Sequence, residues 1–178
     1  RVHFAGVSMD AFQIAGRTEA LSVLSIELNP TAVECARRAH RMLERNKACK
    51  TAGVANRLTI VEGDVLDVLK LQKRNNYYDR VLAPRPKEGA MDGDLGKGDG
   101  GVTFLRAIMP VLKRDGGECH WYDFVADHEF PDCDRTRQLL ASVGAEEGLS
   151  VEILHVANVG SVAMRQLRVC VDFRVYSA

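Results

Sequence analysis

Short apolar stretches typical of β-strands alternate along this chain with stretches that have helical periodicity. The strand-like stretches cover residues 1–6, 21–27, 57–61, 79–83 and 118–124, and the helical ones cover 10–20, 30–49, 65–71, 102–113 and 135–143. Strands that alternate with helices favour a parallel sheet with helices on both faces. Two further strand-like stretches, 151–159 and 167–176, predict a terminal antiparallel hairpin. We therefore expect an α/β fold with a mostly parallel seven-stranded sheet.

The charge balance and the cysteines indicate which kinds of partner and which cellular compartment suit this protein. The 178 residues include 24 Lys and Arg against 24 Asp and Glu, so the net charge is zero. This excludes a polycationic nucleic-acid coat but allows a local basic face. Five scattered cysteines without a C-x-x-C pair predict a reducing compartment, in the first place the cytoplasm, with mitochondrial or nuclear pools as alternatives.

No apolar run approaches the roughly 18 residues needed to cross a bilayer, so we expect no membrane partner. The length fits one domain. A strand-like stretch begins at Arg1, and we expect the chain to be a fragment whose upstream part is not included.

The ends of the first three strands carry residues suited to a nucleoside ligand. Gly6 follows the first strand, Glu27 ends the second, and Glu62-Gly63-Asp64 follows the third. Ligands of open α/β sheets bind at such carboxyl ends. Glu27 would accept the ribose hydroxyls, and Asp64 the exocyclic amine of an adenine. The alternatives are a simple turn at Gly6, a surface Glu27, and an Asp64 that only caps the next helix.

The turn that contains Gly6 helps to choose between two candidate cofactors, NAD and S-adenosylmethionine. A dinucleotide needs a glycine-rich turn that holds its pyrophosphate on a helix N-terminus. The turn here has Ser8 where a second glycine would help. S-adenosylmethionine carries no phosphate and tolerates such a turn, so we favour it over NAD.

Several blocks resemble the catalytic domain of the tRNA (guanine-37 N1) methyltransferases and of the related wybutosine-synthesising aminocarboxypropyl transferases. These blocks are F-A-G-V at 4–7, I-E-L-N-P at 26–30, E-G-D at 62–64, D-R-V-L-A-P-R-P at 79–86, H-W-Y-D-F at 120–124 and V-D-F-R-V at 171–175. The resemblance implies a Rossmann-like class I methyltransferase fold over residues 1–178, without the family's upstream RNA-recognition region. It implies S-adenosylmethionine as cofactor and tRNA as partner. The cofactor-binding positions that it implies are Phe4, Ala5, Gly6, Val7, Glu27, Leu28, Asp64 and Val65.

The chain departs from the family pattern at two places. The family's F-A-G-V-G is F-A-G-V-S here, and Phe12 comes later than the family's Pro-Phe. The methyltransferases also carry N-L-P after the fourth strand, where this chain has Pro84-Arg85-Pro86. Pro84 has no side-chain amide, so the asparagine's role in holding the target guanine must fall to another residue or be absent.

Transfer to guanine N1 needs a proton acceptor and precise alignment. The candidate catalytic residues are Arg85, which could pair a phosphate or a guanine edge, Glu88 and Asp123. The alternatives are an exposed arginine, a solvated loop charge at Glu88, and an Asp123 that only bonds local backbone. Of the adjacent Trp121 and Tyr122, one must point into the core, which leaves the other as a possible stacking face.

Two further features bear on partners. The helix after Pro30 carries Arg37, Arg38, Arg41, Arg45, Lys47 and Lys50, which suit a phosphate backbone or simply a solvated face. The histidines show no metal-ligand spacing, and we expect no metal site.

We expect a tRNA (guanine-N1) methyltransferase. The alternatives are aminocarboxypropyl transfer to tRNA, a degenerate domain that only binds, and a nucleotide-dependent oxidoreductase or small-molecule methyltransferase.

Overall fold

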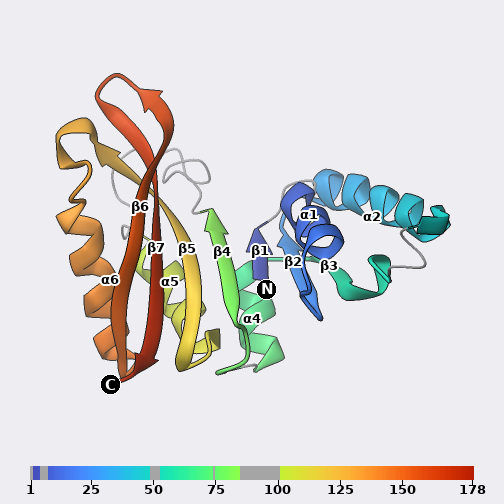
Figure 1. Cartoon of the computed structure of the whole chain (residues 1–178), viewed down its shortest axis with the longest axis horizontal. Coiled ribbons are helices and arrows are strands. Elements are labelled where there is room, and N and C mark those ends of the chain that lie inside the picture. Colours follow the sequence, from blue (N-terminus) through green and yellow to red (C-terminus); the bar gives the residue numbers. More distant parts are fainter. Residues whose placement is uncertain (1, 5–7, 49–52, 74, 85–100) are drawn as a thin grey trace. The chain divides into compact units, whose positions relative to one another are not determined.

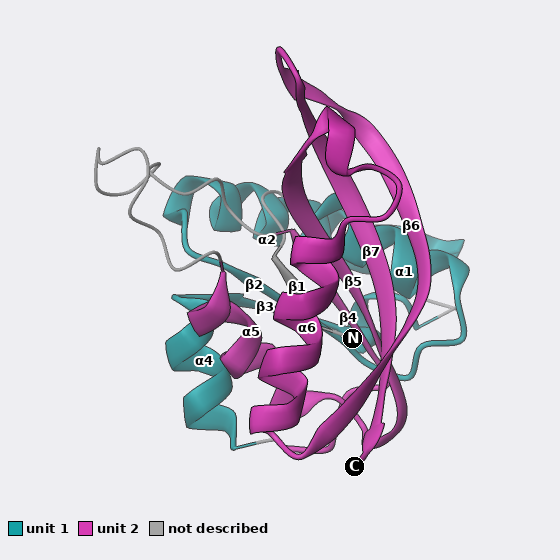
Figure 2. Cartoon of the chain, turned by 90° about the vertical axis from the view of Figure 1, so that its left-hand side faces the viewer, with its two compact units in different colours: residues 1–73 teal, residues 74–178 magenta. Residues whose placement is uncertain are grey.

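The computed structural model describes residues 2–4, 8–48, 53–73, 75–84 and 101–178. The chain divides into two compact units, residues 1–73 and 74–178, each of which combines strands with helices (Figure 1, Figure 2). This confirms the α/β class expected from the sequence. Among the residues described, no helix is both long enough and apolar enough to cross a membrane.

Unit 1 (residues 1–73) contains a parallel sheet in the order β3-β2-β1. Its strands are β1 (Val2–Phe4), β2 (Val23–Glu27) and β3 (Leu58–Glu62). Its helices are α1 (Met9–Arg17), α2 (Pro30–Arg45), the 3-10 turn Ala55–Arg57 and α4 (Val65–Gln72).

The expected start of α2 is confirmed, whereas the ends of α1 and α2 differ from expectation. The Asn29 side chain accepts hydrogen bonds from the backbone N–H of Thr31 (2.9 Å) and Ala32 (3.3 Å), with Pro30 at the first helical position. Helix α2 ends at Arg45 rather than near residue 49, and α1 ends at Arg17 rather than at residue 20. At the end of α1, Thr18 turns extended and its hydroxyl donates to the Ile14 carbonyl at 2.8 Å.

The core of unit 1 lies between its sheet and helix α1. Ala11 and Ala15 of α1 are fully buried against Val23, Val54 and Leu58. All residues from Val23 to Ile26 are buried, so both faces of β2 are covered. This central position explains why the strand is apolar without alternation. It begins at Val23 rather than at residue 21, where the side chain is 92% exposed.

Unit 2 (residues 74–178) contains a four-stranded sheet in the order β4-β5-β7-β6. Its strands are β4 (Arg80–Pro84), β5 (Asp115–Ala126), β6 (Leu149–Ala163) and β7 (Gln166–Ser177). Its helices are α5 (Val102–Ile108), α6 (Asp134–Glu146) and the 3-10 turns Met109–Val111 and Asp127–Glu129. Helix α5 is shorter than expected because Pro110 offers no backbone N–H to continue it.

The strand pairings within the two units agree in part with the expected, mostly parallel sheet: both pairings of unit 1 are parallel. Within the two units the pairings form short sheets, and both long ladders of unit 2 are antiparallel: β5 with β7, and β6 with β7. The pairing of β4 with β5 is parallel. A tight turn at Met164 and Arg165 joins β6 to β7, and so short a connection permits only antiparallel pairing. The expected terminal hairpin is therefore confirmed.

The two faces of β5 differ in character. Trp121 is fully buried and its ring lies 5.6 Å from that of Phe104 in α5, while Asp123 contacts Thr136 of α6. Residues with odd numbers in β5 therefore face the helices, which lie side by side along one face of this sheet (Figure 2). Because side chains alternate along a strand, His120 and Tyr122 lie on the other face and are half-buried.

We expect the stability of unit 2 to fall in acid through Glu118. Its carboxylate accepts from Arg174 Nη2 at 2.6 Å and pairs with Arg80. The bond from Arg174, with the charge of Arg80, holds the pKa of Glu118 below its ordinary value. A lowered folded-state pKa stabilises the fold above the unfolded-state pKa, and this stabilisation is lost as pH falls through the folded-state value.

In urea unfolding, Glu118→Gln should therefore lower the midpoint at pH 7, and the difference from wild type should shrink as the pH falls through the lowered pKa of Glu118. Glu34→Gln, at a largely exposed position on α2, serves as the control and should leave the midpoint unchanged. A Glu118→Gln difference that stays constant from pH 7 to acid would contradict the assignment.

Candidate functional site

The three parallel strands of unit 1 bring their carboxyl ends to one edge of the sheet. In the register, Phe4 lies beside Ile26, and Glu27 lies beside Glu62. The backbone N–H of Gly63 donates to the Glu27 carbonyl at 3.0 Å, which holds the two strand ends together. The structure therefore gathers the strand ends that carry Glu27 and Asp64, as the sequence predicts.

The Glu27 carboxylate is oriented at the tip of β2. Its Oε1 accepts a hydrogen bond from the Asn29 backbone N–H at 2.8 Å, and the residue is half-buried. The following Leu28 is 45% exposed. A carboxylate held in this way at a strand tip can accept hydrogen bonds from the hydroxyl groups of a ligand at the edge of the sheet.

Asp64 begins helix α4. Its Oδ1 accepts from the Leu66 backbone N–H at 2.7 Å, and Val65 beside it is only 9% exposed. The capping role considered from the sequence is therefore present. This bond occupies one carboxylate oxygen, so capping is compatible with a contact from the other oxygen to a ligand.

The predicted cofactor loop lies mostly outside the residues that the structure describes. Ala5, Gly6 and Val7 fall outside them, and only the backbone of Phe4 is described. Ser8, which follows directly, has a φ of 62°, in the left-handed region that favours glycine. Its hydroxyl is buried and lies 2.8 Å from the hydroxyl of Ser25 in β2. Ser8 thus keeps the backbone conformation that a glycine would adopt here, and the bond to Ser25 offsets part of the strain.

The three candidate catalytic residues are not brought together within the described residues. Arg85 and Glu88 lie outside them. Asp123 is 1% exposed and accepts from Thr136 Oγ1 and from the Phe124 backbone N–H, both at 2.7 Å. These bonds match the local role considered from the sequence, and a catalytic role for the three residues stays a prediction.

The structure settles which of Trp121 and Tyr122 is packing. Trp121 is fully buried, and Tyr122 lies on the other face with the Arg168 guanidinium 4.9 Å from its ring centre. Tyr122 is paired with Pro84 at the end of β4. Tyr122 and Arg168 therefore form a cation–π pair beside that strand end.

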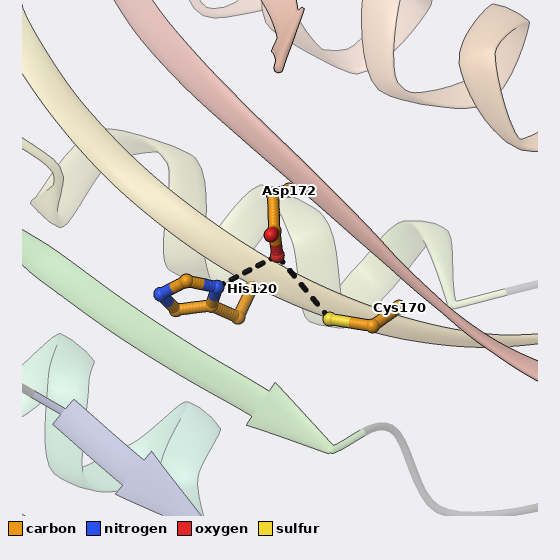
Figure 3. A group of neighbouring side chains, drawn as sticks. All are labelled: His120, Cys170 and Asp172. Carbon is orange, nitrogen blue, oxygen red and sulfur yellow. Dashed lines mark hydrogen bonds and ion pairs between the residues drawn. The ribbon is translucent and has the colours of Figure 1, made fainter. Parts of the chain in front are cut away.

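Sequence reasoning missed a group of side chains on the same face of unit 2. His120 of β5 lies close to Cys170 and Asp172 of β7 (Figure 3). Its Nδ1 is 2.7 Å from Asp172 Oδ1, and the Cys170 thiol donates to the same oxygen at 3.3 Å. The residues stand about 50 positions apart in the sequence, so only the register of β5 on β7, which pairs His120 with Asp172, could have indicated this group.

Comparisons with known proteins identify the fold. No family model matches the sequence, and no curated protein matches it significantly. Among solved structures, M. jannaschii TYW2 in complex with AdoMet has a TM-score of 0.78 at 21% identity, covering 99% of this chain and 68% of that one. Trm5b from Pyrococcus abyssi has a TM-score of 0.73 at 21% identity, covering 98% of this chain. The chain spans only 44% of Trm5b.

The same fold occurs with other chemistry. The [4+2]-cyclase SpnF has a TM-score of 0.68 at 16% identity, covering 99% of this chain and 74% of that one. Likeness at these identities therefore establishes architecture, and function depends on the site. On this evidence the chain has the α/β fold that TYW2, Trm5b and SpnF share.

Proposed function

We propose that this chain is the catalytic domain of an S-adenosylmethionine-dependent tRNA methyltransferase that acts on N1 of the guanine next to the anticodon. The observation that carries the proposal is the oriented Glu27 carboxylate at the edge where the three strands of unit 1 end. The likeness in fold to TYW2 with AdoMet and to a tRNA m1G37 methyltransferase from M. jannaschii supports the choice of cofactor and substrate.

The residues at this edge fit an adenosyl ligand. Glu27 would accept both ribose hydroxyls, with Leu28 beside it. Asp64 would accept the adenine amine through the oxygen that does not cap α4, and Val65 would line the ring. Phe4, Ala5, Gly6 and Val7 would approach the methionine portion. The cofactor supplies an electrophilic methyl group on a sulfonium.

The protein's part in the chemistry is alignment and proton removal. Guanine N1 must approach the methyl carbon in line, and its proton must pass to a base as the new N–C bond forms. We propose Glu88 as that base and Arg85 as the group that holds the guanine or its phosphate. Asp123, enclosed as described above, is the weaker candidate for the base.

Helix α2 offers a surface for the tRNA backbone. Arg38 and Arg45 are exposed on it, and the exposed Lys47 follows shortly after its end. Arg37 and Arg41 line a shallow groove of about 360 Å³ between α2 and β3, although each also pairs with an acid. Phosphate contacts of this kind position a nucleic acid without reading its sequence.

We also propose a reducing, cytoplasmic location, since the four cysteines described are free thiols.

Aminocarboxypropyl transfer is the second candidate, because Pro84 stands where the methyltransferases carry the asparagine of N-L-P. The same cofactor would then give up its aminocarboxypropyl group instead of its methyl group.

A double-label assay separates the two reactions. The purified full-length protein is incubated with unmodified tRNA and with S-adenosylmethionine that is labelled either in the methyl group or in the aminocarboxypropyl chain. We expect the methyl label alone to enter tRNA, in the nucleotide next to the anticodon, and to be lost in Glu27→Ala. Incorporation of the chain label would refute methyl transfer. Cofactor binding without transfer of either label would indicate a binding module.

A further inference from the structure

Three different metal-binding atoms lie together on the face of unit 2 that is turned away from α5 and α6. They are His120 Nδ1 of β5 and, from β7, Cys170 Sγ and Asp172 Oδ1, all within 4.8 Å of one another (Figure 3). His120 and Asp172 are each a little over one quarter exposed, and Cys170 is 8% exposed. The group is thus sheltered yet reachable from solvent.

The strand pairing holds these side chains in place. His120 lies directly opposite Asp172 in the antiparallel ladder, and Cys170 is two residues away on the same strand, so all three project from the same face. Their neighbours Trp121, Val171 and Phe173 are fully buried on the other face and anchor both strands. A site whose ligands stand on such anchored strands is preorganised.

We propose that His120, Cys170 and Asp172 bind a divalent transition-metal ion of borderline softness, for which Zn²⁺ fits best, with the fourth position left to water. An imidazole nitrogen, a thiolate and a carboxylate oxygen are the donors that Zn²⁺ takes in proteins. Mg²⁺ and Ca²⁺ prefer oxygen donors throughout and would not use the sulfur.

The two distances that involve Asp172 require only a small adjustment. Tetrahedral bonds of about 2.0–2.3 Å place neighbouring ligand atoms roughly 3–4 Å apart. The contact from Cys170 to Asp172, at 3.3 Å, already lies in this range, and the contact from His120 to Asp172, at 2.7 Å, must open by less than about 1 Å. Side-chain rotation supplies such a movement without a change in the ladder.

The Asp172 carboxylate places a negative charge beside the sulfur. In the metal-free protein the Cys170 thiol donates a hydrogen bond to Asp172 Oδ1. When the sulfur–metal bond forms, the thiol proton leaves to solvent, and the bound cation offsets the repulsion between the thiolate and Asp172. Neutral His120, which binds through the lone pair of Nδ1, is the third protein ligand.

Cobalt spectroscopy on the metal-free 178-residue protein tests the proposal. Co²⁺ should produce a thiolate-to-cobalt charge-transfer band and tetrahedral visible bands that saturate at one ion per chain and disappear on addition of Zn²⁺. Cys170→Ser should abolish the charge-transfer band. His120→Gln and Asp172→Asn should weaken Co²⁺ binding about tenfold or more, since even the loss of residues that only support ligands weakens metal binding by about 10–100-fold.

Two matched controls use the same residue types elsewhere in the chain. Cys35→Ser in α2 and His128→Gln, whose side chain is 82% exposed, should leave the spectrum and the Co²⁺ affinity unchanged. Circular dichroism establishes that each variant is folded. The wild-type spectrum decides the matter even if a variant does not fold. Absence of the charge-transfer band in wild type, or its persistence in folded Cys170→Ser, would overturn the proposal.

Discussion

Replacing Glu27 by alanine should lower the affinity of this protein for S-adenosylmethionine about a hundredfold while leaving the fold intact. Charge-assisted hydrogen bonds contribute roughly 1.5–3 kcal/mol each, and the proposed site uses this carboxylate for two ribose hydroxyls. The side chain is half-buried at a strand tip, so its removal creates no large cavity. Equilibrium dialysis with radiolabelled S-adenosylmethionine measures the affinity.

Glu34→Ala provides the matched control for Glu27→Ala. Glu34 is an exposed glutamate of α2, with a side chain that is 70% exposed, and it should leave the affinity for S-adenosylmethionine unchanged. Circular dichroism and thermal melting compare the folds of the two variants. If Glu27→Ala bound the cofactor within threefold of wild type, the ribose role of Glu27 would be wrong.

Trp121→Ala should lower the free energy of unfolding by about 3–5 kcal/mol, the usual cost of removing a large aromatic side chain from a core. Trp121 is fully buried against α5, with its ring 5.6 Å from that of Phe104. Tyr122→Ala should cost much less, about 1 kcal/mol, because Tyr122 is only half-buried and its contact with Arg168 is a cation–π contact of modest energy. Urea unfolding of both variants gives the comparison.

Trp121→Phe refines this comparison. The indole Nε1 of Trp121 is buried without a hydrogen-bond partner in the part of the chain that the structure describes. Phenylalanine removes this unsatisfied donor while it keeps most of the apolar surface, so it should cost clearly less than alanine. A larger loss of stability from Tyr122→Ala than from Trp121→Ala would mean that the two faces of β5 are assigned the wrong way round.

Much of the secondary structure could be predicted because its signals are local. The start of α2 depends on Asn29 and Pro30, and the start of α4 on Asp64, all of which act on backbone groups within three residues. The element ends were less predictable. Nothing apolar distinguishes Asp115 from the preceding loop, yet β5 begins there because β7 offers it a partner in Tyr176.

The meeting of the strand ends in unit 1 could be predicted from the sequence, because such ends lie together wherever parallel strands pair. The His120, Cys170 and Asp172 group could not, since it depends on which residue of β7 lies opposite which residue of β5. A shift of the register by one residue would send Asp172 to the helix-covered face and break the group. The left-handed conformation of Ser8 was also unpredictable, because its hydrogen-bond partner, Ser25, lies 17 residues away in strand β2.

Calorimetric titration of the wild-type protein with S-adenosylmethionine and, separately, with NAD⁺ tests the central claim most directly. Ribose hydroxyls occur in both ligands, but only NAD⁺ brings a pyrophosphate that needs a glycine-rich turn. We predict saturable binding of one S-adenosylmethionine per chain and no measurable heat from NAD⁺. Binding of NAD⁺ without binding of S-adenosylmethionine would contradict the account.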